Sequence, residues 1–264
     1  METSLMGGLA GKRAFVCASS AGLGLACATA LAQAGADVRI NGRDATRLAD
    51  AARRIRHAAP GAIVQVVQAD LHVPAQRAVC WQGEDAPDIL VLNGGGPPVE
   101  EVADYAERDW QAAFERLFQP GADLLSRALP AMQRRGWGRV VAISSVAIKA
   151  PIPGLVASTV FRLGLAGLIA GRCTAVAGQG VTLNSILPGR ILTDRQEAAL
   201  DREARRHNRS RAEQLDLVRA AIPAGRLGSP GEVGALCAFL CSPDAGYITG
   251  QNILIDGGAY GATF

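Results

Sequence analysis

The order of short and long apolar segments constrains the fold of this chain most strongly. Short runs rich in Val, Ile and other strand-forming residues alternate with longer Ala- and Leu-rich stretches that have helical periodicity. We expect strands at 13–18, 37–41, 63–69, 88–93, 139–144, 181–186 and 252–255. The helical patterns lie at 22–34, 44–57, 104–117, 121–134, 157–177 and 231–241.

This alternation predicts an α/β fold with one parallel sheet. Parallel neighbours need a long return connection, which the intervening helices supply. The strand runs are apolar throughout, as expected for a sheet covered by helices on both faces. The chain of 264 residues is long enough for one such core and contains no repeat or linker-like tract. We therefore predict a single domain, 1–264, with a doubly wound sheet of about seven strands.

Composition and charge exclude several function classes. The net charge of +3 is too small to indicate a nucleic-acid partner. The six cysteines are scattered through apolar segments and the three histidines lie far apart, so we predict neither disulfides nor a metal site. No signal peptide is recognisable, and the most apolar stretch, 154–170, contains Arg162. We expect a cytoplasmic protein without a membrane partner.

A glycine-rich turn follows the first predicted strand. Gly22 and Gly24 lie between that strand and the next helix, where small residues let the backbone approach a pyrophosphate, although such glycines also serve simple turns. The second strand ends in Asn41-Gly42-Arg43. An acidic residue here would bind the ribose 2′-hydroxyl of NAD, whereas a cation suits the 2′-phosphate of NADP. Arg43 therefore favours NADP(H) over NAD(H), unless it only caps the loop.

Over nearly its whole length the chain resembles the short-chain dehydrogenase/reductase family, particularly its ketoacyl-reductase-like members. The family pattern T-G-x-x-x-G-x-G corresponds to residues 17–24, with the first two places changed. Residues 92–95, Leu-Asn-Gly-Gly, stand for N-N-A-G, and 188–193 match P-G-x-x-x-T. The C-terminal stretches 222–240 and 247–258 are close to the family consensus.

The resemblance implies a Rossmann-type fold and a set of cofactor contacts. In the family, the residues after the third strand contact adenine and the P-G-x-x-x-T segment holds the nicotinamide carboxamide. Carried over to this chain, the expected cofactor-binding residues are Ala18, Ser19, Ser20, Gly22, Leu23, Gly24, Arg43, Asp70, Leu71, Asn93, Gly94, Arg162, Pro188, Gly189, Ile191 and Thr193.

The family's catalytic asparagine, serine, tyrosine and lysine are only partly present. Ser145 keeps the serine, but Ser158 stands in the tyrosine place, Arg162 in the lysine place and Leu117 in the asparagine place. Ser158 and Arg162 are four residues apart and share a helix face. A phenol has a pKa of about 10, an alkyl hydroxyl is far less acidic, and arginine does not relay protons. Lys149 is a candidate replacement acid, with a solvated loop lysine as the alternative.

Two further segments are expected to shape the substrate pocket. Pro120-Gly121 should break a helix near the pocket, which we interpret as a repacked, drier bend rather than a purpose-built wall. Residues 193–221 resemble the family's substrate lid, and their arginines outnumber the acids. They would either dock an anionic or carrier-linked small-molecule substrate or form a solvated helix face.

Three functions remain open from the sequence. The first is an NADPH-dependent reductase of a carbonyl or conjugated ketone, in which Ser145, Ser158 and Arg162 bind the oxygen. The second is a redox-neutral dehydratase, isomerase or cyclase that uses Arg162 and Lys149. The third is a non-catalytic nucleotide-binding partner subunit. The resemblance also implies a homodimer or homotetramer built on the long fourth and fifth helices.

Overall fold

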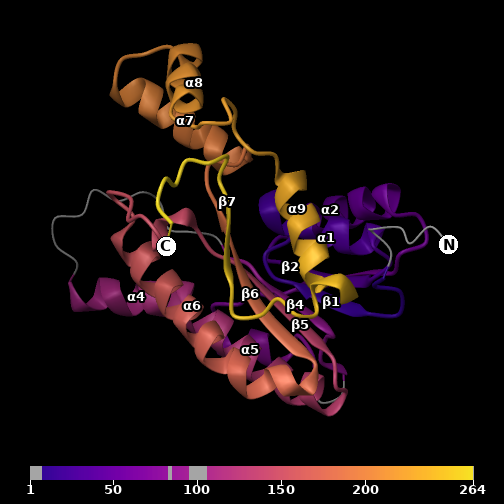
Figure 1. The fold of residues 1–264 in the computed structure, drawn as a ribbon. Coiled ribbons are helices and arrows are strands. Elements are labelled where there is room, and N and C mark those ends of the chain that lie inside the picture. Colours follow the sequence, from indigo (N-terminus) through magenta and orange to yellow (C-terminus); the bar gives the residue numbers. More distant parts are fainter. Residues whose placement is uncertain (1–7, 83–84, 95–105, 264) are drawn as a thin grey trace.

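The computed structural model describes residues 8–82, 85–94 and 106–263. Its centre is a seven-stranded sheet with the order β3-β2-β1-β4-β5-β6-β7, in which every neighbouring pair is parallel (Figure 1). The strands are β1 Arg13–Val16, β2 Asp37–Gly42, β3 Val64–Gln68, β4 Ile89–Leu92, β5 Gly138–Ile143, β6 Val181–Pro188 and β7 Asn252–Ile255.

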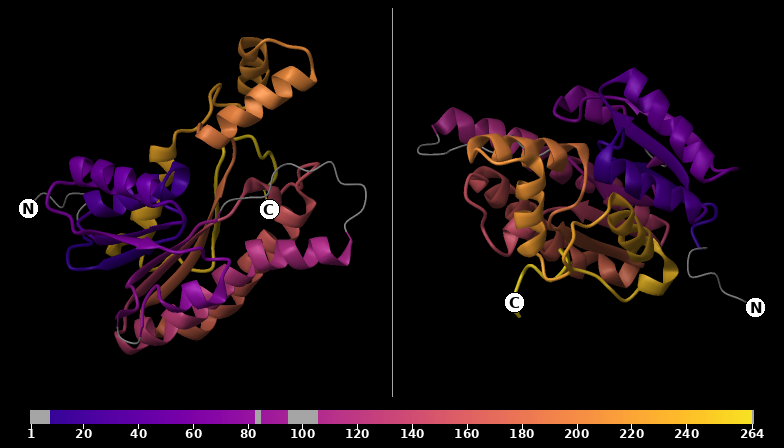
Figure 2. Two further views of the ribbon diagram at one scale, coloured as in Figure 1. Left: turned by 180° about the vertical axis from the view of Figure 1, so that it is seen from behind. Right: turned by 90° about the horizontal axis from the view of Figure 1, so that it is seen from above.

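Two layers of helices cover the sheet (Figure 2). One layer contains α1 Gly22–Gln33, α2 Ala45–Ala58 and α9 Pro230–Cys241, and the other contains α4 Glu107–Leu117, α5 Gln119–Arg134 and α6 Val156–Val176. Successive strand residues serve the two sides in turn: Ala14 and Val16 belong to the α1/α9 core, and Phe15 belongs to the α5/α6 core. This alternation explains why the central strands are largely apolar on both faces.

The shorter helices lie at the ends of the strands or between the larger elements. They are α3 Pro74–Ala78 and three 3-10 turns, η2 Val146–Ile148, η3 Ala177–Gln179 and η4 Pro243–Ala245. The order of strands reverses between β1 and β4, because β2 and β3 continue on one side of β1 and the later strands on the other. Such a switch point opens a crevice at the carboxyl ends of the strands.

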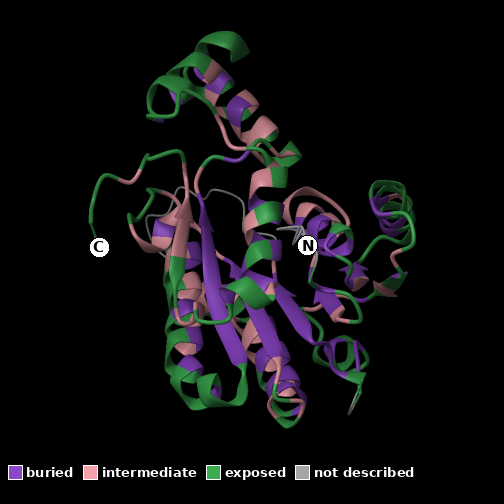
Figure 3. Cartoon of the chain, turned by 45° about the vertical axis from the view of Figure 1, so that its right-hand side comes forward, coloured by how far each residue is buried: buried purple, intermediate pink, exposed green. Residues whose placement is uncertain are grey.

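Two helices project beyond the carboxyl edge of the sheet (Figure 1). They are α7 Asp194–Arg206 and α8 Arg211–Ala220, and they occupy the segment expected to be a lid. They share a small core of Leu200, Val218 and Ile222, separate from the two main cores. Most of their surface is exposed, in contrast to the buried strands (Figure 3).

The structure confirms the predicted parallel α/β sheet, with element ends within a few residues of those expected. Three helices were not among the predicted helical patterns: α3, and the helices α7 and α8 of the expected lid. The predicted helix break is present: α4 ends at Leu117, Phe118 caps it, and α5 begins at Gln119. The start of that helical pattern at 104 lies outside the described residues. All six cysteines are buried and unpaired.

The long helix α6 also meets the length and composition of a membrane span, together with the turn that follows it. An 18-residue window within 156–179 has a mean hydropathy of 1.4, and 17% of that window is buried. One such helix is weak evidence for a membrane span, because core helices of soluble proteins pass the same test. In this fold α6 packs on the sheet through Ala166, Ile169 and Cys173.

Candidate cofactor and substrate site

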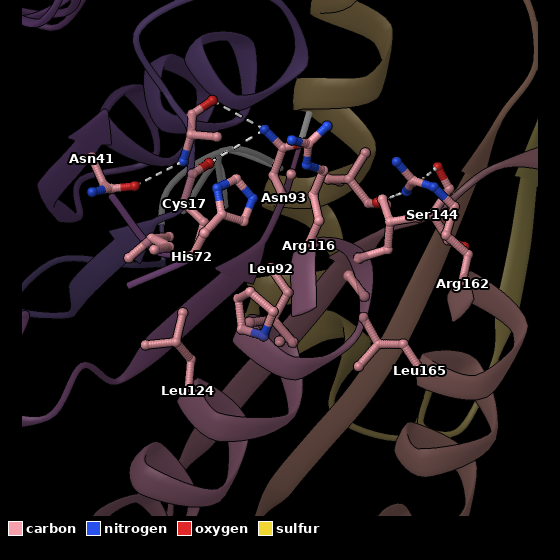
Figure 4. Close-up of a pocket in the computed structure, with 18 of the residues that line it drawn as sticks. Cys17, Asn41, His72, Leu92, Asn93, Arg116, Leu124, Ser144, Arg162 and Leu165 are labelled. Atoms are coloured by element: carbon pink, nitrogen blue, oxygen red, sulfur yellow. Dashed lines mark hydrogen bonds between the residues drawn. The ribbon is translucent and has the colours of Figure 1, made fainter. Parts of the chain in front are cut away.

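A cavity of about 370 Å³ lies at the carboxyl ends of the strands, where the switch point predicts a crevice (Figure 4). Residues at the ends of β1 to β5 and Ser185 of β6 form the side along the sheet. The junction of α4 and α5 and the first half of α6 close the other side. The expected cofactor residues in its lining are Ala18, Ser20, Arg43, Asp70, Leu71, Asn93, Gly94 and Arg162.

The glycine-rich turn leaves the start of α1 open to an anion. Gly22 has a φ of +56°, which favours glycine, and a side chain there would approach Thr193. No side chain caps the first turn of α1, whereas Asp44, Thr193, Ser210 and Ser229 cap α2, α7, α8 and α9. The first-turn amides of α1 therefore have no side-chain acceptor, and a phosphate would supply one.

Gly24 is required by the close packing around this turn. A Cβ at this position would lie 2.4 Å from the Ala18 carbonyl oxygen and 2.7 Å from Asn93 Nδ2. The Asn93 amide donates to the carbonyls of Cys17 and Ala18 at 3.3 and 3.1 Å, so it ties the end of β4 to the turn. Gly95 and the residues that follow it lie outside the described residues.

The turn is also fixed from β2. Ser19 is fully buried; its hydroxyl donates to the Val16 carbonyl at 2.7 Å and accepts from the Asn41 amide at 2.9 Å. The Asn41 side chain accepts from the Ala18 amide and donates to the carbonyls of Val67 and Ala69. Ser19 thus serves the loop and does not line the cavity.

Arg43 and Asp70 mark one end of the cavity. Arg43 is largely exposed and its guanidinium lies 3.8 Å from the Asp70 carboxylate. Burial alone would raise the pKa of Asp70, but hydrogen bonds and charge from His72, with the charge of Arg43, lower it below its ordinary value. Arg43 is therefore held loosely and is free to turn toward a 2′-phosphate.

The opposite end contains Arg162. Its Nε donates to Ser158 Oγ at 3.1 Å, and its Nη1 donates to the carbonyls of Ile143 and Ser144 at 2.9 and 3.1 Å. The residue as a whole is only half-buried because it has surface in the cavity, whereas its guanidinium is desolvated. Desolvation, with a smaller effect of the Arg195 charge, lowers the pKa of Arg162 to about 10.

The other three candidate catalytic residues lie next to the cavity but are not part of its lining. Ser158 is buried on α6 beside Arg162. Ser145 precedes η2, and its hydroxyl accepts from the Ala147 amide at 3.1 Å. Lys149 is half-buried at the end of the same 3-10 turn. The structure thus brings Ser158 and Arg162 into contact and leaves Lys149 outside the cavity lining.

Residues 188–193 connect β6 to the lid without lining the cavity. Gly189 packs so closely on Asp256 that a Cβ would lie 2.7 Å from its side chain. Ile191 is buried and pairs with Gly228, and Thr193 caps α7 by accepting from the Gln196 amide. Residues 188–193 therefore position α7 above the cavity.

Leu23, another expected cofactor residue, is half-buried and packs against the α1/α9 core.

Several residues in the lining were not predicted from the sequence. The polar ones among them are Asn41, His72, Arg116, Ser144 and Ser185. Leu117 occupies the position of the family's catalytic asparagine. Arg116 directly precedes it in the sequence, and this neighbourhood is a signal that could have pointed to Arg116. The two serines lie on strand ends between recognised motifs and carry no sequence signal of their own.

The lid arginines are partly used within the lid. Arg211 forms ion pairs with Glu197 and Asp201, and Arg209 donates to Gln214. Arg195, in the first turn of α7, lies near enough to Arg162 to lower the pKa of that residue. The lid therefore directs at least one positive charge toward the cavity.

The residues present fit a dinucleotide. Ala18 and Ser20 of the turn before the uncapped helix α1 and the loosely held Arg43 line one cavity that also contains Arg162. Gly22 and Gly24 shape this turn but do not line the cavity. Ser20, Asn93 and Gly94 would contact the cofactor between these ends. When bound, a reduced nicotinamide would supply a hydride at this site.

Comparison with known proteins agrees with this geometry. Residues 17–260 match a protein-family model described as Enoyl-(Acyl carrier protein) reductase. The chain is 32% identical to Dehydrogenase/reductase SDR family member 4 of Oryctolagus cuniculus, covering 95% of this chain and 94% of that protein. It is 29% identical to the NADPH-dependent reductase BacG of Bacillus subtilis, with 94% and 97% covered. L-Sorbose reductase of Gluconobacter frateurii, solved with NADPH and L-sorbose, has a TM-score of 0.89 at 28% identity, with 98% and 100% covered.

Proposed function

This chain belongs to the short-chain dehydrogenase/reductase family, and we propose that it is an NADPH-dependent reductase of a carbonyl or conjugated-ketone substrate that works without the family's tyrosine. One observation carries the proposal: Arg43, the open turn before α1 and Arg162 line a single cavity. A cofactor bound along it would have its 2′-phosphate at Arg43 and its nicotinamide near Arg162.

The reaction adds one hydride and one proton to the substrate. Reduced nicotinamide, when bound near Arg162, would supply the hydride for the new C–H bond, and the C=O π electrons would move to the oxygen held by Ser158 and Ser145. We assign the proton to water. No described side chain in the lining has both the length and the acidity of the tyrosine phenol that the family uses as its proton donor. The product is an alcohol and the cofactor leaves oxidised.

The serine hydroxyls would hold the carbonyl oxygen. Ser158 Oγ accepts from Arg162 Nε, and Ser145 Oγ accepts from the Ala147 amide, so each hydroxyl keeps its own proton to donate. Arg162 makes the Ser158 hydroxyl a better donor and stabilises negative charge that develops on oxygen. Losing a positioned general acid typically lowers a rate by about 10²–10⁴, so we expect slow turnover or an intrinsically electrophilic substrate.

The test is NADPH oxidation, followed by absorbance, across oxo acids, thioesters, quinones and enones, with the product identified by mass. We expect a product heavier by two hydrogens and one NADPH consumed per product. Product at the same oxidation level without NADPH consumption would instead favour a redox-neutral enzyme, for which the missing tyrosine is the supporting observation. Background oxidation with every substrate class would contradict the proposal.

A further inference from the structure

Two arginines that have no acidic partner among the described residues line the cavity, each from a different helix. Arg116 comes from the last turn of α4 and Arg162 from α6, and both line the cavity (Figure 4). Within the described ranges, no carboxylate lies within ion-pair distance of either. Arg162 uses Nε and Nη1 for its protein contacts, and no described residue accepts from its Nη2.

The positive charges of Arg116 and Arg162 are not neutralised by carboxylates in the described lining of the cavity. Asp70 is the one carboxylate among the described lining residues, and it is engaged by His72 at 2.9 Å and by Arg43 at the opposite end. A desolvated cation without a counter-charge is costly, so the site favours an anion that would pair with it.

Two buried hydroxyls in the same lining also lack partners. Ser144 Oγ and Ser185 Oγ are inaccessible to solvent and make no hydrogen bond, and Ser185 is 1% exposed. A buried hydroxyl without a hydrogen-bond partner destabilises the folded state. Because these oxygen atoms are inaccessible to solvent, each side chain would have to change rotamer to donate to a ligand in the cavity. Ser144 lies beside Arg162, because its carbonyl accepts from Arg162 Nη1 at 3.1 Å.

The remaining wall at this end is apolar. Leu92, Leu117, Leu124 and Leu165 line the cavity with Pro120, at the break between α4 and α5. These side chains offer no partner to a second polar group, so they suit the hydrocarbon part of a ligand. The ligand that matches both surfaces has an anionic head and a short apolar body.

We propose that Arg116, Arg162 and the hydroxyls of Ser144 and Ser185 form a carboxylate-binding subsite, so that the substrate is a short oxo acid with a free carboxylate and an apolar body. This inference rests on the proposed reductase function and replaces the broader expectation of an anionic or carrier-linked substrate. Only Nη2 of Arg162 is left to donate to a carboxylate, because Nε and Nη1 already donate to protein groups. A pair of parallel hydrogen bonds would therefore come from the guanidinium of Arg116.

The test uses a matched pair of unreactive probes, 4-methylpentanoate and 4-methylpentanamide, which differ in charge at one end. Each is titrated calorimetrically into the protein alone and into the protein saturated with NADPH. We expect the carboxylate to bind at least about 10-fold more tightly than the amide, with and without NADPH. Arg116→Met should remove most of this difference, and Arg162→Lys should retain part of it. Arg108→Met, on the exposed side of α4, is the matched control and should change nothing.

Other results would overturn the inference. Equal binding of the two probes, or no binding of either, would show that the arginines do not select a carboxylate. Carboxylate binding that disappears with NADPH would assign the arginines to a cofactor phosphate instead. Absence of NADPH binding would contradict the reductase proposal separately, because the cofactor-free titration still tests the subsite.

Discussion

At the residue scale, Ser158 and Arg162 form a donor pair of a different kind from a phenol and an ammonium group. The Nε of Arg162 donates to Ser158 Oγ at 3.1 Å, so the serine proton is free to point toward a substrate oxygen. The pair can still donate a hydrogen bond to the substrate carbonyl, but it lacks the acidic phenol that would transfer a proton. It therefore polarises a substrate rather than protonating it.

Ser158→Ala should lower kcat by about 10²-fold with a smaller change in KM, because the lost hydrogen bond is strongest in the transition state. Steady-state NADPH oxidation with the best substrate measures this. Ser126→Ala removes a hydroxyl that donates only to the Asp123 carbonyl on α5 and is the control. An unchanged kcat in Ser158→Ala would remove this serine from the reaction.

The unpaired charge of Arg162 has a measurable effect on stability. Desolvation lowers the pKa of Arg162 from its ordinary value to about 10, which corresponds to roughly 3 kcal/mol at about 1.4 kcal/mol per pKa unit. For a base with a lowered pKa, this destabilisation is present below pH 10 and is relieved as the pH rises through that value. A bound anion would relieve it at neutral pH.

We therefore expect Arg162→Met to leave the unfolding free energy of the ligand-free protein within about 1 kcal/mol of wild type, or to raise it, because the lost hydrogen bonds offset the relieved desolvation. Arg77→Met is the comparison: Arg77 is 3% exposed and binds Asp123 at 2.8 Å, so its loss should cost about 2–3 kcal/mol. Denaturant unfolding at pH 7 measures both. A larger loss in Arg162→Met than in Arg77→Met would contradict this account.

At the element scale, the cofactor turn depends on the close approach of β1, β4 and α1. The Ala18 carbonyl and the Asn93 amide occupy the space where Gly24 would carry a side chain. Gly24→Ala should destabilise the fold by about 1–3 kcal/mol and weaken NADPH binding, because a backbone atom must move. Gly231→Ala, in the first turn of α9, meets only Ser229 Oγ at 3.8 Å and should leave both stability and binding nearly unchanged. Thermal unfolding with and without NADPH distinguishes the two, and equal behaviour would contradict the packing argument.

The elements were predictable to different extents. The strands and long helices follow from apolar periodicity, because buried faces must repeat with the geometry of each element. The short α3 carries too few residues for such a pattern. The turn chemistry at Gly22 and Gly24 was also readable, since a positive φ and close contacts require glycine.

Much of the candidate site could not be predicted from local patterns in the sequence. Arg116 reaches the cavity only because the chain breaks between α4 and α5 and because Trp110 and Phe114 pack on Phe161 of α6. Ser144 and Ser185 become unsatisfied only when their neighbours bury them. Such tertiary consequences leave no local pattern in the sequence.

At the scale of the whole molecule, α6 presents an apolar face to solvent. Val156, Val160 and Leu163 are 45%, 46% and 53% exposed on one side of this helix. A contiguous apolar face of this kind is typical of an interface. We propose that a second copy of the chain covers it, as the family resemblance implies.

Leu163→Glu should then shift the molecular mass in solution from a multiple of 27.4 kDa toward the monomer, because a charge would be buried in the interface. Light scattering after size exclusion measures the mass. Val79→Glu alters a 65% exposed apolar residue after α3 and is the control. A wild-type monomer, or an assembly that tolerates Leu163→Glu, would contradict the proposed interface.

The proposed reductase function requires the cavity to bind NADPH with its 2′-phosphate at Arg43, and calorimetric titration with NADPH and NADH measures this binding. We expect wild type to bind NADPH at least about 10-fold more tightly than NADH. Arg43→Ala should abolish that preference while leaving NADH binding unchanged, and Arg47→Ala, on the exposed start of α2, should have no effect. Failure of wild type to bind either nucleotide, or equal affinities that Arg43→Ala does not alter, would contradict the account.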